Sequence, residues 1–127
     1  MHILDFTALV HNYCQLRQLP IPAPNGVSFI IEQEDALPVI LAWDEERDDI
    51  VLIVPLYAQA VALDTQEAHD ILCAAFVGQG LNGAAISIDP NTGVLSLWRR
   101  LASEAASLER LTQDIQHITQ AAQHVKL

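Results

Sequence analysis

Residues 26–57 read GVSFIIEQEDALPVILAWDEERDDIVLIVPLY, and this stretch decides the fold of the chain. β-Branched and aromatic residues fill three runs, Val27–Glu32, Val39–Trp43 and Ile50–Leu56. Acidic and turn-forming residues separate the runs. Such runs, bounded in this way, predict three consecutive strands of an antiparallel meander.

The third run is apolar on both faces of the strand that it predicts. Because side chains alternate along a strand, Ile50, Leu52 and Val54 point to one side, and Val51 and Ile53 point to the other. An antiparallel sheet normally buries only one of its faces. A helix, a partner subunit or a ligand chain must therefore cover the second face, and this surplus is the main clue to function.

Helices are expected on both sides of the meander. Residues 3–18 carry apolar residues at spacings of three and four, which is typical of an amphipathic helix. A second helix is expected from Asp64, which can act as N-cap with Glu67 three residues further on. Its apolar stripe includes Ile71 and Phe76.

The last part of the chain predicts a strand pair and a helix. Strands are expected over Ala84–Ile88 and Val94–Leu101, because the residues between them have turn chemistry. Ser103 is the expected cap of the last helix, whose apolar residues from Leu108 to Val125 repeat at steps of three and four. A helix packed on the sheet and a short coiled coil both explain this repeat, and the short length favours the packed helix.

The expected order is therefore α–β–β–β–α–β–β–α. Runs of strands separated by helices indicate an α+β fold, a twisted antiparallel sheet with helices packed on it. At 127 residues the length is that of one domain, and we expect residues 1–127 to form it.

The composition points to association and excludes nucleic acid. The chain is 51% hydrophobic and only 17% charged, and its 16 acidic residues outnumber its 6 basic ones to give a net charge of −10. Such a surface repels phosphates. Half of the acids lie between Glu32 and Asp49, where they either are simply solvated or steer a basic partner.

No pattern for catalysis, for a cofactor or for a metal is found. The five histidines are scattered, and two cysteines, Cys14 and Cys73, are expected to be buried, reduced thiols. No phosphate-binding glycine loop with its lysine occurs, since the single lysine is Lys126. No apolar run is long enough to cross a membrane, and no signal peptide is recognised. We therefore expect a cytoplasmic protein that binds other proteins, without cofactors or enzymatic activity.

One stretch makes the expectation more specific. The sequence Ala85–Asp89, followed by Gly93–Trp98, resembles the hairpin region of class I type III secretion chaperones (the CesT or Tir chaperone family). The size, the acidity and the order of elements over nearly the whole chain are also similar to that family. The resemblance implies a bacterial chaperone that binds the N-terminal region of a secreted effector and keeps it soluble and ready for secretion.

The resemblance also implies two surfaces. Family members are homodimers joined through the second helix and later strands, and the effector wraps the dimer in an extended form. The residues implied at the dimer interface are Ile71, Leu72, Ala75, Phe76 and Trp98. The residues expected to contact the effector are Leu9, Phe29, Ile31, Ile40, Leu41 and Ile53.

Two alternatives remain open at this stage. A regulatory module of the anti-activator type could use the same fold to bind a single regulator. A small-ligand-binding domain or enzyme would instead be a monomer with a closed cavity and convergent polar groups.

Overall fold

The computed structural model describes residues 3–57 and 62–125. The elements are α1 (Ile3–Leu16), β1 (Ser28–Ile31), β2 (Val39–Asp44), β3 (Asp49–Pro55), α2 (Thr65–Ala74), β4 (Ala85–Ile88), β5 (Leu95–Ala102) and α3 (Leu108–His124). Two short 3-10 turns, Phe76–Gly78 and Ser103–Ala105, follow α2 and β5. The predicted α+β class and the predicted order of helices and strands are confirmed.

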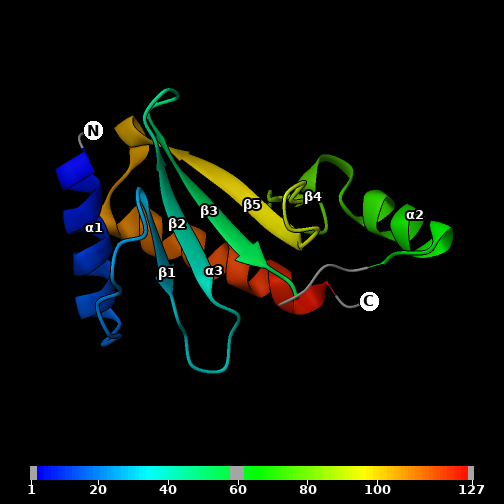
Figure 1. Ribbon diagram of the computed structural model, residues 1–127, viewed down its shortest axis with the longest axis horizontal. Coiled ribbons are helices and arrows are strands. Elements are labelled where there is room, and N and C mark those ends of the chain that lie inside the picture. The colour runs from blue at the N-terminus through cyan, green and yellow to red at the C-terminus, as the bar shows by residue number, and fades with distance from the viewer. Residues whose placement is uncertain (1–2, 58–61, 126–127) are drawn as a thin grey trace.

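The five strands form one antiparallel sheet in the order β1-β2-β3-β5-β4. The meander of the first three strands is continuous with the later pair, because β5 pairs along seven residues of β3. β1 and β4 are therefore the two edge strands. Figure 1 shows α1 beside β1, α3 crossing the sheet, and α2 projecting at the opposite end from α1.

Strict alternation decides which face of the sheet is buried. In β2 the residues Val39, Leu41 and Trp43 are buried, and the residues between them are only half-buried. The ring of Phe6 from α1 lies 5.8 Å from that of Phe29 and 6.2 Å from that of Trp43. α1 and α3 thus cover one face of the sheet, and the core lies between that face and these helices.

α3 is a sheet-packed helix, as the sequence favoured, but its start differs from the prediction. Ser107, not Ser103, is the N-cap, and its hydroxyl accepts a hydrogen bond of 3.1 Å from the Arg110 N–H. The chain makes a 3-10 turn at Ser103 first, and the Ser103 hydroxyl lies 2.6 Å from the Asp48 carboxylate. Either serine can cap a helix, so the sequence did not distinguish them.

Candidate functional site

The face of the sheet opposite α1 and α3 carries a row of apolar side chains across all five strands. The register places Ile30 opposite Ile40, Ile40 opposite Ile53, and Ile53 opposite Trp98, which in turn faces Ala85. None of these residues belongs to the core, and Ile30 is 45% exposed. Among the described residues, no helix packs on this face. We call this row the open-face row.

The edge of the sheet beside Ile30 has unused backbone groups. The Trp43 N–H donates to the Val27 carbonyl. In an antiparallel pair, every second residue directs its backbone N–H and C=O toward the neighbouring strand, so Val27, Phe29 and Ile31 are the residues that hydrogen-bond to β2. Ser28 and Ile30 therefore direct their backbone groups outward. Asn25 pairs with Ser28 through two hydrogen bonds of 2.8 and 3.1 Å. The edge is thus closed at Ser28 and open from Ile30 onward, where an extended chain could add as a further strand.

Beside the open-face row, two residues from Trp98 along β5, Arg100 forms a polar cluster. The Arg100 guanidinium donates to Asp44 at 2.9 Å and to Asp49 at 2.8 Å, and it lies 5.9 Å from the Trp98 ring. The hydrogen bond from Arg100 is the main reason that the pKa of Asp44 is lowered from 3.8. The guanidinium lies over the Trp98 ring at a cation–π distance. A shallow groove of about 260 Å³ lies there, lined by Val51, Ile53, Ser87, Asp89, Ser96, Trp98 and Arg100.

α2 is the least buried helix of the described chain, since none of its residues is buried. Its start agrees with the prediction, because the Asp64 carboxylate accepts a 2.8 Å hydrogen bond from the Glu67 N–H. That hydrogen bond lowers the pKa of Asp64, and the hydrogen bond between the two carboxyl groups raises the pKa of Glu67. Leu72 is 68% exposed and Phe76 just after the helix is 69% exposed.

The helical repeat gives α2 two different faces. At 3.6 residues per turn, Leu72 lies about 100° around the helix from Ile71, and Phe76 follows Leu72 by four residues. Ile71 packs against the core together with Ala75. Leu72 and Phe76 are largely exposed, and Leu72 lines the rim of a groove of about 270 Å³ between α2 and β4. Cys73 is also exposed, which corrects the expectation of a buried thiol there; Cys14 is buried as expected.

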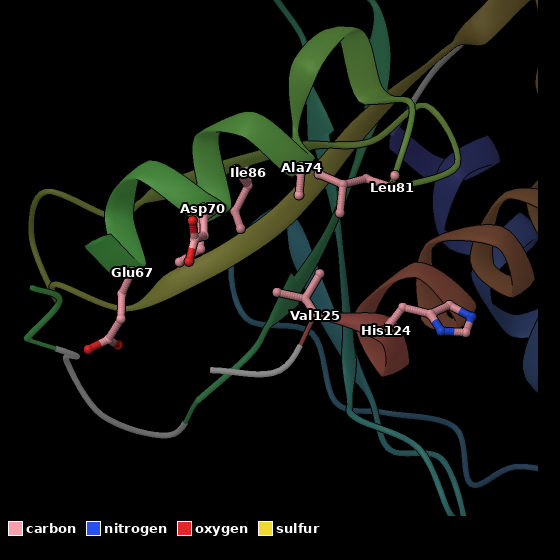
Figure 2. Close-up of a pocket in the computed structure, with 9 residues that line it drawn as sticks. Glu67, Asp70, Ala74, Leu81, Ile86, His124 and Val125 are labelled. Atoms are coloured by element: carbon pink, nitrogen blue, oxygen red, sulfur yellow. The ribbon is translucent and has the colours of Figure 1, made fainter. Parts of the chain in front are cut away.

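A second groove, of about 330 Å³, separates α2 from the C-terminal end of α3. Figure 2 shows the Glu67 and Asp70 carboxylates on the α2 side and Val125 on the other side, while the His124 ring points away from α2. Ile86 from β4 also lines the groove. The groove leaves part of α2 uncovered on the side of α3, which is one reason that the helix buries so little.

Three of the six predicted contact residues belong to the core. Phe29, Ile31 and Leu41 alternate onto the face covered by the helices and are almost fully buried. They are therefore not available on the surface of this chain, and their assignment as lining residues is corrected. The sequence showed two apolar faces on the strands, but only the packing of α1 and α3 decides which of them is covered.

The other three predicted contact residues remain partly accessible. Ile40 and Ile53 lie side by side in the open-face row, opposite each other in register. Leu9 is half-buried on α1, which packs on the far side of the sheet, so it is separate from the row. Ile30 was missed as a contact residue, because only the register, which places it opposite Ile40, puts it on the open face.

The residues predicted at a dimer interface fall into three places. Leu72 and Phe76 are largely exposed, whereas Ile71 and Ala75 pack against the core. Trp98 lies in the open-face row, on the other side of the sheet from the β4 and β5 side chains that face α2. Within one chain they therefore do not form a single patch.

The site contains no arrangement for metal chemistry in the described residues. No group of three histidine, cysteine, aspartate or glutamate side chains within residues 3–57 and 62–125 could hold a metal ion. Over the same ranges, none of the helices has the length and apolar character needed to cross a membrane. The cavities found there are surface grooves of about 250–330 Å³.

An open apolar sheet face, an unpaired sheet edge and a projecting amphipathic helix define a protein-binding module. The sequence comparison then gives the family. The model of the Tir chaperone protein (CesT) family matches residues 8–126, so this chain belongs to that family. A sequence comparison with curated proteins gives no match.

Solved structures with the same fold include chains from chaperone complexes. A chain of the HopA1–SchA chaperone–effector complex superposes with a TM-score of 0.77 at 14% identity, over 95% of this chain and 92% of that one. A chain of the ExsC–ExsE complex gives 0.75 at 13% identity, over 93% and 88%. The structure of the Yersinia pestis type III secretion chaperone SycH with a fragment of YscM2 gives 0.68 at 16% identity, over 95% and 99%. At these identities the likeness shows the fold.

Proposed function

We propose that this protein is a cytoplasmic type III secretion chaperone of bacteria, which binds the N-terminal region of an effector and keeps it soluble and secretion-competent. It acts by binding, with no cofactor and no catalytic step. Membership of the Tir chaperone family and the similarity in fold to chains from solved chaperone complexes support this proposal. The observation that carries it is the open-face row, an apolar surface that the described chain does not cover.

The effector contacts the half of the row nearest to β1. Ile30, Ile40 and Ile53 supply apolar side chains, and the outward backbone groups of Ile30 supply hydrogen bonds for an added strand. Burying one such side chain is worth about 1.5–3 kcal/mol, and each backbone hydrogen bond adds about 0.5–1.5 kcal/mol. A few such contacts along an extended segment are enough for stable binding without a folded partner.

The proposed homodimer uses the other end of the molecule. Leu72 and Phe76 are about two-thirds exposed, and neighbouring exposed apolar side chains of this kind are typical of association surfaces. Trp98 and α2 lie on opposite sides of the sheet, so they can meet only between two chains. A two-fold contact in which α2 of each chain packs on the Trp98 end of the other would cover both surfaces at once.

The test is co-expression with the protein encoded next to it, followed by size-exclusion chromatography and limited proteolysis of the pair. We expect a complex of two chaperone chains with one partner, in which only the N-terminal part of the partner is protected from protease. A complex that protects a folded domain of the partner, or a monomer that binds no neighbouring product, would contradict the proposal.

A further inference from the structure

A polar groove lies between the two helices that cover the sheet. It has a volume of about 250 Å³ and runs between the end of α1, the turn after β1, and α3. Its lining residues are Tyr13, Arg17, Gln33, Glu34, Asp35, Ala36, Thr112, Ile115, Gln116, Thr119, Gln120 and Gln123. We call it the amide groove, because glutamines predominate among them.

The α3 wall of this groove carries no charged residue. Thr112, Gln116, Thr119, Gln120 and Gln123 share one side of the helix, at the spacing of three and four that a helical face requires. The three α3 glutamines are exposed, and their side chains make no hydrogen bond with another described residue. Each amide offers two donors and an acceptor, which suits both the N–H and the C=O of a passing backbone.

The apolar part of the groove is not accessible. Tyr13 and Ile115 form its floor, and both are almost fully buried. Burial is the main reason that the pKa of Tyr13 is raised. An apolar side chain entering the groove would therefore gain little, because the area that it could cover is small.

The groove continues toward the open edge of β1. An adjoining groove of about 320 Å³ is lined by Arg17, Gln18, Leu19, Gln33 and Glu34, three of which also line the amide groove. Gln33 stands where the two meet, and its side-chain amide donates to the Leu37 carbonyl at 3.1 Å and lies 3.5 Å from the Thr119 hydroxyl. Since the edge of β1 is open from Ile30 toward Glu32, a strand added there leads directly to this junction.

We infer that the amide groove binds an extended, uncharged polar segment of the effector, next in sequence to the segment that pairs with β1. The inference rests on the proposed function, because it takes the added strand as its starting point. Thr112 and Gln123 are eleven residues apart, about 16 Å along the helix, which matches about five residues of extended chain. Segments of serine, threonine, asparagine and glutamine fit, because their side chains can also pair with the amides of the wall.

A charged segment fits less well. Its charge would lose hydration against a wall without a counter-charge on α3, and such a loss is costly. Arg17 and Glu34 line both grooves, and Asp35 lines the amide groove, so charges of both signs are present opposite α3 and do not select a segment of one charge.

The test uses labelled synthetic peptides and fluorescence anisotropy with the full chain. The parent peptide alternates valine and threonine, as an added strand requires. Three longer peptides extend it by five residues that alternate serine and asparagine, leucine and serine, or glutamate and serine. Each is titrated with the wild type, with Gln120→Ala and with Gln113→Ala, the last being an exposed α3 glutamine outside the groove and therefore the matched control.

We expect the serine–asparagine extension to tighten binding about fivefold, which is the effect of one to two net hydrogen bonds. The gain should remain in Gln113→Ala and disappear in Gln120→Ala. The inference is overturned if the extension gives no gain, if the leucine or glutamate extension gives the same gain, or if the gain survives in Gln120→Ala.

Failure of the proposed strand addition is recognised separately. Ile30→Pro removes the outward N–H at the open edge, a substitution that an edge strand tolerates. If the parent peptide binds the wild type but not Ile30→Pro, the edge is used, and an absent extension effect refutes the amide groove alone. If none of the four peptides binds the wild type, both the added strand and the groove are refuted for this chain.

Discussion

Asp114 is the most deeply buried charged residue of the described chain, at 2% exposure in the middle of α3. The Arg110 Nε donates to its carboxylate at 3.2 Å, and the Arg99 guanidinium of β5 lies 3.8 Å away. Arg99 in turn donates to the Asn82 carbonyl at 3.4 Å, and the Asn82 amide donates to the His117 carbonyl. This polar set joins α3, β5 and the loop that follows α2.

Replacing Asp114 by alanine should lower the free energy of unfolding by about 1–3 kcal/mol, because the half-buried Arg99 loses its countercharge. Urea unfolding measures this. Arg110→Ala is the control, since Arg110 is a largely exposed partner of the same carboxylate and such pairs contribute about 0–1 kcal/mol. Equal losses of unfolding free energy in the two variants would show that the pair of Asp114 and Arg99 contributes no more stability than the pair of Asp114 and Arg110.

Residue patterns predicted local structure better than burial. The Asp64 cap forms as predicted, but Phe29 and Leu41, which were expected to contact the effector, alternate onto the face that α1 and α3 cover and are buried. Cys73 was expected to be buried because it lies beside the apolar stripe of α2, but the helix has no covering element in this chain. Apolar residues at helical spacing indicate that a helix has an apolar side. They do not indicate which element covers that side.

At the scale of elements, the β2–β3 hairpin is held by one arginine between two carboxylates. The pKa of Asp44 is lowered by its hydrogen bond to Arg100, so its folded-state value lies below the ordinary 3.8. A lowered pKa means that the stabilisation is present above the unfolded-state value and is lost as the pH falls through the folded-state value.

Arg100→Met should therefore be less stable than the wild type near neutral pH, and its stability should fall less steeply on acidification below about pH 4. Thermal unfolding followed by circular dichroism over this range measures both effects. Arg47→Met is the control, because the Arg47 side chain has only the smallest influence on Asp44. A wild type and an Arg100→Met variant with parallel acid profiles would contradict this role of Arg100.

A second prediction at this scale concerns α2. Leu72→Asp places a charge on the exposed side of α2 and should convert the proposed homodimer into monomers. The core should remain intact, because Leu72 contacts little of it. Light scattering coupled to size-exclusion chromatography gives the mass. Leu16→Asp, at an exposed leucine near the end of α1, should remain dimeric.

A stable dimer should bury at least about 1,200 Å² in total, which is more than one side chain provides. Trp98→Asp should therefore have the same effect as Leu72→Asp if α2 packs on the Trp98 end of the other chain. Dimers of unchanged mass for both variants would place the interface elsewhere.

At the scale of the whole molecule, the order of elements and the antiparallel sheet could be predicted, but the open face could not. The third run, Ile50–Val54, is apolar on both sides, and the sequence alone gave no reason to prefer one. The choice depends on contacts such as that of Phe6 with Phe29 and Trp43, which join segments far apart in the chain. The point at which the β1 edge becomes open likewise depends on the pairing of Asn25 with Ser28, and no local sequence pattern predicts that pairing.

The measurement that tests the account most directly is the amount of effector retained by two matched variants in co-purification. Ile30→Asp changes an isoleucine of the open-face row that is 45% exposed, and Ile21→Asp changes one in the connection before β1 that is 51% exposed. We predict that Ile30→Asp lowers effector affinity by about tenfold or more, since an apolar contact worth about 1.5–3 kcal/mol is lost, and that Ile21→Asp retains the wild-type amount. Equal retention by the two folded variants would contradict the claim that the open face of the sheet binds the effector.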